Sequence, residues 1–282
     1  MRLVTYSIGG DTQVGALTGD KVVPVSEASG PMSMLELISA GPYAWEDAAD
    51  RARSGRGALD LRVVRLLTPI SNPGKVVAIG LNYMDHAREQ GVEPPSQPLV
   101  FAKFTSSIIG PDDSISWAPA LTSQVDYEVE LAVVIGRQAR NVAEAEALEH
   151  VFGYTVLNDV SARDLQFGDG QWVRGKSLDT FCPIGPAIVT PDEVPDPQAL
   201  PLRCWVNDQL LQDSSTSEMI FGVAYLISYL SRAFTLHPGD IIATGTPFGV
   251  GVFRDPQVFL QDGDTVAVEV EGIGRLENQV RL

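Results

Sequence analysis

Three carboxylates stand at alternate positions near the middle of the chain, at Asp126, Glu128 and Glu130. β-Branched and aromatic residues fill the segment 125–135 around them and Gly136 follows it, so this segment is predicted to be a β-strand. Residues two apart on a strand share a face, which would point all three acids the same way. Like charges at that spacing repel each other on an otherwise apolar strand. A hard cation with oxygen ligands would relieve the repulsion.

Two acids are few for a dedicated metal site, so a third ligand should come from elsewhere in the chain. The Cα atoms of Glu128 and Glu130 would lie about 7 Å apart on a strand, which allows both side chains to share Mg²⁺ or Mn²⁺. Asp159 ends the apolar run 153–158 and is the candidate for the third ligand. Asp126 is expected in a supporting or solvated position. The alternative is an exposed acidic strand, together with an aspartate that caps a turn.

Of the three histidines in the chain, His86 has the sequence context of a general base. The segment 80–91 is predicted to leave a strand and form a short helix, with Asn82 as its N-cap and Gly91 as its end. His86 and Glu89 are three residues apart and therefore neighbours on that helix. A carboxylate beside an imidazole fixes its tautomer and raises its basicity, which suits activation of water. The alternative is an ordinary surface pair on an exposed helix.

Cationic side chains near such a site would offset its negative charge and bind an anionic substrate. The chain has 20 basic residues, of which only four are lysines, so each lysine is informative. Lys176 lies in a glycine-punctuated loop, and Arg163 follows the candidate ligand Asp159 by four positions. Both are candidates for substrate contacts. The alternative is that they pair with nearby acids such as Asp164 and Asp179.

The elements that must position these residues divide the chain into two predicted domains. Residues 1–72 would form a small N-terminal α+β domain, because prolines and a glycine near its end interrupt regular structure. Residues 73–282 would form the catalytic domain, which is rich in strands. The overall class is α+β, predominantly β, with mixed or antiparallel sheets.

Periodicity and turn residues predict the individual elements of both domains. One helix is expected to begin near Ser215, where Ser215 and Glu218 fit a capping box and an apolar stripe follows. The other predicted helices cover 34–40, 44–53 and 142–149. The predicted strands cover 3–7, 12–17, 21–24, 76–80, 125–135, 153–158, 187–189, 202–207, 240–244 and 265–270.

Composition narrows the classes of partner and compartment. The chain has 282 residues, 44% of them hydrophobic, and a formal net charge of −16. The acidic balance argues against nucleic acid and anionic membrane as partners, since both attract basic surfaces. No apolar stretch reaches membrane-spanning length. The two cysteines stand in unrelated contexts without metal-type spacing, which favours a reducing, cytoplasmic location.

Taken together, these segments resemble the fumarylacetoacetate hydrolase family. The matching motifs occur in the family's order over about residues 73–282. They are Gly80-Leu81-Asn82-Tyr83 with His86 and Glu89, Asp126 to Leu131, Asn158 to Asp164, Gly175 to Asp179, and Pro238-Gly239-Asp240 to Gly251. The leading segment resembles the small N-terminal domain that some members add.

The resemblance implies a fold, a cofactor and roles for particular residues. The fold would be a mixed β-sandwich or β-roll catalytic domain, and the protein would be a homodimer. The His86–Glu89 dyad would lie on a mobile lid, and Lys176 would pair with an oxyanion or carboxylate. The cofactor would be Mg²⁺ or Mn²⁺ held by Glu128, Glu130 and Asp159. Arg163, Gln166 and Thr246 match positions used around substrate or in support of the site.

One departure from the family pattern concerns Lys103, which many members follow with proline. Here Phe104 takes that place, which could reshape the substrate pocket, and Lys103 is left out of the predicted site.

The favoured activity is metal-dependent hydrolysis of a C–C bond in an acylpyruvate-like 2,4-dioxo acid. The metal would stabilise the enolate that forms when a bond to C3 breaks, after His86 activates water. The same intermediate serves oxaloacetate decarboxylation and keto–enol tautomerisation or isomerisation of a 2-oxo acid, so these remain open. The substrate in each case is a small anionic 2-oxo acid. The contrasting class is an inactive small-molecule binding protein, which would be expected to lack a metal ligand or the dyad.

Overall fold

The computed structural model describes residues 1–26 and 33–282, and strands predominate in it. The α+β, predominantly β class is therefore confirmed. The strands are β1 Arg2–Ile8, β2 Asp11–Thr18, β3 Lys21–Pro24, β4 Leu59–Asp60, β5 Arg65–Leu67, β6 Val76–Gly80, β7 Leu99–Lys103, β8 Ile108–Ile109, β9 Ser114–Ile115, β10 Val125–Asp126, β11 Val129–Ile135, β12 Val151–Asn158, β13 Ser161–Ala162, β14 Cys182–Val189, β15 Pro201–Val206, β16 Gln209–Ser215, β17 Ile241–Ala243, β18 Thr265–Val270 and β19 Gly274–Val280.

Helices are short and lie mostly between strands. No helix in residues 1–26 and 33–282 is long and apolar enough to cross a membrane. The α-helices are α1 Met34–Ala40, α2 Pro42–Ser54, α3 Met84–Gln90, α4 Arg163–Asp169, α5 Val173–Lys176 and α6 Val223–Ala233. The 3-10 helices are η1 Leu61–Val63, η2 Thr105–Ser107, η3 Glu144–His150, η4 Pro191–Glu193, η5 Thr216–Glu218 and η6 Gly251–Phe253.

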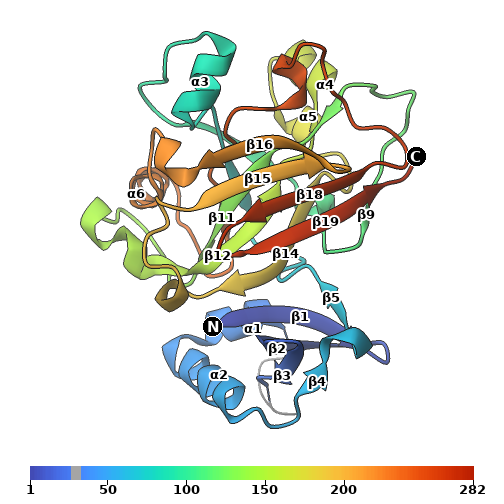
Figure 1. The fold of residues 1–282 in the computed structure, drawn as a ribbon. Coiled ribbons are helices and arrows are strands. Elements are labelled where there is room, and N and C mark those ends of the chain that lie inside the picture. Colours follow the sequence, from blue (N-terminus) through green and yellow to red (C-terminus); the bar gives the residue numbers. More distant parts are fainter. Residues whose placement is uncertain (27–32) are drawn as a thin grey trace.

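A 12-stranded mixed sheet runs through the leading segment and the rest of the chain. Its main order is β4-β3-β2-β1-β14-β12-β11-β17-β6-β7, with β5 on β1 and β8 on β14. Strand β1 pairs antiparallel with β14 through Leu3 opposite Ile188, so the two predicted domains share a sheet. In Figure 1 the leading segment, in blue, lies below β14.

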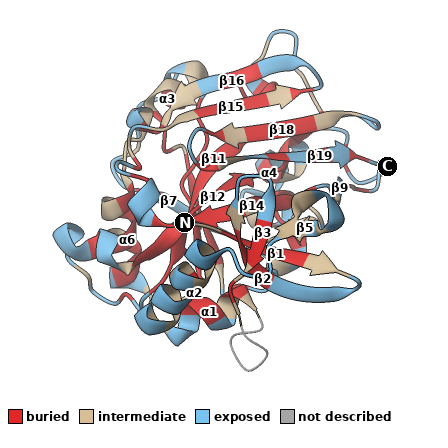
Figure 2. Ribbon diagram, turned by 60° about the horizontal axis from the view of Figure 1, so that its bottom comes forward, coloured by how far each residue is buried: buried red, intermediate tan, exposed pale blue. Residues whose placement is uncertain are grey.

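A second sheet packs against the centre of the first. Its five strands run β16-β15-β18-β19-β9, and β15 and β18 lie against β11 and β12. The main hydrophobic core fills the space between them, with Leu131 and Val133 of β11 beside Cys204 and Val268 of the second sheet. Figure 2 shows buried residues concentrated on these strands and exposed residues on the outer side of α2. Strand β11 is therefore buried along its whole length in the middle of the protein.

The predicted strand over 125–135 is interrupted. Its first part, β10, pairs with β13, whereas β11 pairs with β12 from Val129 opposite Asn158. Where β10 gives way to β11, backbone N–H groups bond to side chains and not to a neighbouring strand. The Glu128 N–H donates to the Asn158 side chain at 3.0 Å, and the Val129 N–H donates to the Gln212 side chain at 2.9 Å. The strand therefore changes partners at the position where its acids begin to converge.

Two predicted helix starts were wrong for a shared reason. The helix expected near Ser215 begins at Val223, because the Ser215 hydroxyl accepts from the Ser217 N–H and closes only the 3-10 turn η5. Helix α3 has Tyr83 at its N-cap, while the Asn82 amide donates to carbonyls of Phe221 and Thr244. Both polar side chains serve contacts other than the predicted caps.

The segment predicted as a helix over 142–149 is the 3-10 helix η3. The helices expected over 34–40 and 44–53 are present as α1 and α2.

Candidate metal centre and active site

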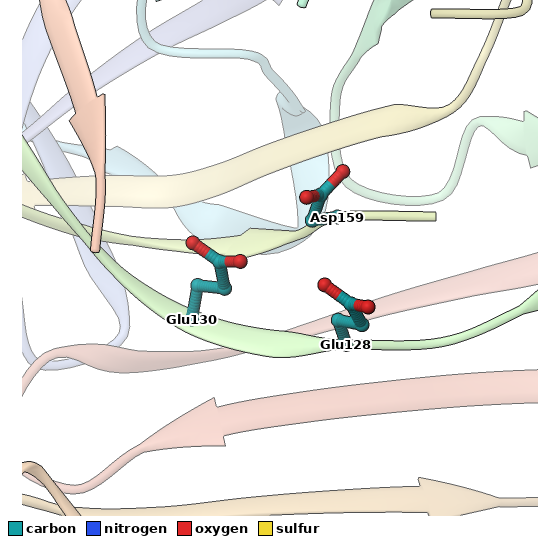
Figure 3. A group of neighbouring side chains, drawn as sticks. All are labelled: Glu128, Glu130 and Asp159. Carbon is teal, nitrogen blue, oxygen red and sulfur yellow. The ribbon is translucent and has the colours of Figure 1, made fainter. Parts of the chain in front are cut away.

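Two neighbouring acids and a third about thirty residues further along the chain converge into one buried cluster. One oxygen from each of Glu128, Glu130 and Asp159 lies within 4.8 Å of the others. Glu128 precedes β11, Glu130 lies on it, and Asp159 follows the paired strand β12. The Asp159 N–H donates to the Glu128 carbonyl at 2.9 Å, which fixes the two backbones together. Figure 3 shows all three carboxylates gathered at the β11–β12 pair.

The electrostatics of the cluster fit a divalent cation. Burial raises the pKa of Glu130 well above its usual range, and the neighbouring carboxylates of Asp159 and Glu128 raise it further. Burial acts in the same direction on Glu128, but Lys176 and Arg163 outweigh it and lower its pKa to about 2. Mg²⁺ and Mn²⁺ prefer oxygen donors such as these three carboxylates. The donor set therefore fits the metal that the sequence suggested.

Two buried lysines contact the acids. The Lys176 ammonium donates to Glu128 at 2.8 Å and to Asp159 at 2.9 Å. Lys103 donates to the other Asp159 oxygen at 2.5 Å and to the Lys176 carbonyl. Phe104, which follows Lys103, is 58% exposed, while the Lys103 side chain is fully buried. Adjacent side chains at the end of β7 take these different environments.

Asp126 does not join the cluster, contrary to the simple one-face expectation. Its carboxylate accepts from the N–H groups of Gly251 and Val252 and pairs with Arg163 at 2.8 Å. The same guanidinium reaches Glu128 at 2.7 Å. Asp126 therefore holds Arg163, and Arg163 holds Glu128. This matches the supporting position expected for Asp126, and it engages much of the Arg163 guanidinium in protein contacts.

The dyad forms on α3, and a third side chain joins it. His86 Nδ1 lies 2.7 Å from Glu89 Oε2, and Glu89 Oε1 accepts from the Gly249 N–H at 2.8 Å. His86 Nε2 lies 2.8 Å from Gln90 Nε2. The helix places both partners beside the imidazole because they follow it by three and four residues. His86 is therefore oriented from both ring nitrogens.

A small pocket joins the dyad to the acids. Its volume is about 140 Å³, and His86, Glu128 and Lys176 all line it. Each residue that the sequence assigned to substrate binding lines it as well, namely Arg163, Gln166 and Thr246. Gln166 accepts from Arg163 at 3.0 Å, and the Thr246 hydroxyl accepts from Gln212 at 2.9 Å. Their roles toward substrate stay predictions.

The apolar wall of this pocket was missed by the sequence analysis. Phe101 and Trp172 meet edge to face with ring centroids 5.3 Å apart, and Lys176 Nζ lies 5.4 Å from the Phe101 centroid. Gly80 makes room for the indole, because a Cβ there would lie 2.3 Å from Trp172. No sequence signal marked the wall. Gln90, by contrast, could have been found from its four-residue spacing to His86.

A larger cavity of about 840 Å³ lies between α2 and the ends of β1, β2 and β12. It is lined by residues such as Trp45 and Phe152 and contains none of the predicted site residues. The candidate site is therefore defined by the convergence of the acids, Lys176 and the His86 imidazole, and not by cavity size.

Known proteins share both the sequence and the fold. Residues 75–281 match the family model described as fumarylacetoacetate (FAA) hydrolase C-terminal. One relative is the protein of Xenopus laevis named "Oxaloacetate tautomerase fahd2, mitochondrial". It is 47% identical to this chain over 252 residues. The match covers 89% of this chain and 79% of that protein.

Among the solved structures that resemble the whole chain are two hydrolases. The fumarylacetoacetate hydrolase from Exiguobacterium antarcticum is 41% identical with a TM-score of 0.87, covering 100% of this chain and 99% of that one. The maleylpyruvate hydrolase from Sphingobium sp. SYK-6, in complex with manganese(II) and pyruvate, is 33% identical with a TM-score of 0.82 at the same coverage. The fold expected of the catalytic domain is confirmed.

Proposed function

The chain belongs to the fumarylacetoacetate hydrolase family, and we propose that it is a Mg²⁺- or Mn²⁺-dependent tautomerase of a small 2-oxo acid such as oxaloacetate. The observation that carries the proposal is one small pocket lined by His86, Glu128 and Lys176. It offers a base, a metal ligand and a cation to the same bound molecule. The 47% identity to an oxaloacetate tautomerase supports the choice among the family's reactions.

Pocket size favours a small substrate. A volume of about 140 Å³ is well below the ~300–1,000 Å³ of sites for drug-sized ligands. Arg163, Gln166 and Thr246 add polar contacts, and Phe101 and Trp172 close the opposite wall. A compact dicarboxylate fits this combination of cations and limited space.

Glu128, Glu130 and Asp159 would hold the metal. When bound, a divalent cation acts as a Lewis acid on the substrate's keto oxygen and acidifies the adjacent C–H. His86, held as the Nδ1–H tautomer by Glu89, takes that proton on Nε2. The C–H electron pair becomes the new C=C bond, and the carbonyl π pair moves to oxygen, where Lys176 offsets the charge. His86 then returns the proton from Nε2 to that oxygen, which gives the enol, and the reverse sequence gives the keto form.

A second candidate is hydrolysis of an acylpyruvate-like 2,4-dioxo acid. The His86–Glu89 pair supports it, because the same imidazole could take a proton from water as the oxygen attacks C4. The likeness to maleylpyruvate hydrolase supports it also. Decarboxylation of oxaloacetate would use the same residues.

One substrate panel separates these reactions. Purified protein with Mn²⁺ is given the enol form of oxaloacetate and, separately, acetylpyruvate. We expect accelerated enol loss without CO₂ release. Pyruvate from acetylpyruvate in place of enol loss would favour hydrolysis, and CO₂ from oxaloacetate would favour decarboxylation.

Two variants test the assignments within this panel. Glu128→Ala is expected to abolish metal binding and all activity, and His86→Ala to abolish proton transfer while the metal remains bound. Calorimetric titration with Mn²⁺ measures the metal affinity of both variants, and the oxaloacetate assay measures proton transfer. Unchanged Mn²⁺ affinity in Glu128→Ala would contradict the ligand assignment.

We also propose a homodimer in a reducing, cytoplasmic compartment. Free, buried Cys182 and Cys204 support the compartment, and the family resemblance supports the dimer. Light scattering on the purified protein measures its mass in solution, and a monomer at working concentration would contradict the assembly.

A further inference from the structure

Gln90 contacts the ring nitrogen of His86 that would act as the base in the proposed reaction. It is the last residue of α3, and Gly91 then turns the chain away at φ 65°. Its side-chain nitrogen lies 2.8 Å from His86 Nε2, and it lines the pocket with His86 and Glu128. The His86 imidazole also packs against the ring of Phe253, with ring centroids 5.9 Å apart.

The direction of this hydrogen bond follows from the other ring nitrogen. The Glu89 carboxylate can only accept, so His86 Nδ1 carries the proton that joins them at 2.7 Å. Nε2 of the neutral imidazole then holds a lone pair, which an amide N–H of Gln90 satisfies. Glu89 is fixed in turn by the Gly249 N–H. The chain Gly249–Glu89–His86–Gln90 is therefore satisfied at every link.

We propose that Gln90 is a positioning residue that keeps the His86 lone pair from water and thereby restricts the site to proton transfer within bound substrate. The inference rests on the proposed function. A water molecule must donate to Nε2 before it can be activated, and the Gln90 amide occupies that donor position. A substrate held by the other polar groups of the pocket, such as Arg163 and Lys176, can displace the amide and present its C–H to the same lone pair, whereas a single water has no such additional contacts.

The two competing reactions differ in what they need from Nε2. Tautomerisation moves one proton from carbon to His86 and returns one to oxygen, with no water consumed. Hydrolysis needs water to lose a proton to His86 as its oxygen bonds to C4, after which the C3–C4 bond breaks. Removing the Gln90 donor therefore frees the position that hydrolysis requires.

The test compares wild type with Gln90→Met, which keeps length and removes the donor. Both proteins are assayed with Mn²⁺ for enol loss from oxaloacetate and for pyruvate release from acetylpyruvate. We expect the ratio of hydrolysis to tautomerisation to rise roughly tenfold in Gln90→Met, about the equilibrium equivalent of one hydrogen bond. Gln138→Met, at an exposed glutamine outside the pocket, is expected to keep the wild-type ratio.

A second readout reports the contact itself. In the Mg²⁺-loaded protein, a ¹⁵N–¹⁵N coupling across the N–H···N bond should join Gln90 Nε2 and His86 Nε2, and it should vanish in Gln90→Met. Equal Mn²⁺ affinity in wild type and Gln90→Met would show that a changed ratio of hydrolysis to tautomerisation comes from the altered hydrogen bond to the His86 imidazole and not from loss of metal.

The outcomes separate this inference from the proposed function. A wild type without tautomerase activity overturns the proposed function. An active wild type whose reaction ratio is unchanged in Gln90→Met, or which lacks the nitrogen–nitrogen coupling, overturns the role of Gln90 and leaves the function standing.

Discussion

At the scale of single residues, the carboxylates of the candidate metal site differ in their pKa because their neighbours differ. Glu128 contacts both Lys176 and Arg163, and its pKa falls to about 2 despite burial. Glu130 receives the Gly245 N–H at 2.8 Å, yet burial and two neighbouring acids raise its pKa. Of these two candidate ligands, Glu128 is thus favoured in its ionised form by neighbouring cations, whereas the surroundings of Glu130 favour its protonated form.

That difference predicts proton release on metal binding. A ligand must be a carboxylate to bind Mn²⁺, so between the ordinary pKa of Glu130 and its raised value, binding expels a proton and affinity rises with pH. Calorimetric titration in buffers of different ionisation enthalpy measures the released proton. Glu130→Gln, which cannot titrate, is the control and should release none from this position. Affinity independent of pH over that interval would contradict the prediction.

Lys103 gives a second prediction at this scale. It and Asp159 are both fully buried, so Lys103→Met leaves a buried carboxylate with one cation fewer. Breaking such a pair costs about 3 kcal/mol or more, so the free energy of unfolding in EDTA should fall by about that amount. The loss should be smaller with Mn²⁺, because the metal supplies positive charge to the same acid. Urea denaturation measures both.

The control for this change is Lys21→Met, at an exposed lysine on β3. It should leave the unfolding free energy nearly unchanged in both conditions. An equal loss for Lys103→Met with and without metal would contradict the shared role of Lys103 and the metal at Asp159.

At the scale of elements, the site depends on close approaches between strands and short helices. The β11–β12 pair brings Glu128 and Asp159 together, and α3 presents its dyad to the loop at Gly249. Strand β6 ends at Gly80, against which the Trp172 indole before α5 packs. The position of Trp172 in the apolar wall of the pocket therefore depends on the absence of a side chain at Gly80.

Gly80→Ala should disturb that wall. The new Cβ would lie 2.3 Å from the indole, so Trp172 must move, at a cost of about 1–3 kcal/mol in the free energy of unfolding. We expect kcat/KM for oxaloacetate to fall while Mn²⁺ affinity is retained. Gly168→Ala in α4, where a Cβ meets no heavy atom within 4 Å, is the matched control. Wild-type kinetics in Gly80→Ala would show that the wall does not shape the site.

At the scale of the whole molecule, the leading segment and the catalytic part share both a sheet and a core. One hydrophobic cluster contains Leu3 and Ile38 from the first part and Phe152 and Ile188 from the second. Strand β14 hydrogen-bonds to β1 on one side and β12 on the other. The expected boundary near residue 72 is thus spanned by continuous structure, and the autonomy of each side remains a prediction.

Deletion of residues 1–72 tests this continuity. The truncated chain would expose an edge of β14 and the apolar side chains of Phe152 and Ile188, which favours association between sheet edges. We expect a lower melting temperature and concentration-dependent aggregation, measured by calorimetry and light scattering. A monodisperse fragment of wild-type stability would show that the catalytic part folds alone.

Local sequence determined the features that depend on neighbouring residues. The helix over 34–40 follows from its capping box, formed by Ser33 and Glu36, and the strands β11 and β12 follow from their apolar runs. The metal candidates followed from the alternation of acids along the predicted strand over 125–135 and from an acid just after β12. The spacing of His86 and Glu89 on a helix gave the dyad. Each depends on geometry that repeats every two to four residues.

Only tertiary structure decided which groups meet across long separations. Strands β8 and β9 have two residues each and exist because distant strands pair with them. Lys176 reaches Glu128 across 48 positions, and the Gly249 N–H reaches Glu89 across 160. Such contacts depend on how the sheets stack, which no local period encodes. The sequence therefore located the acids and the base, and the fold decided which cations and amides control them.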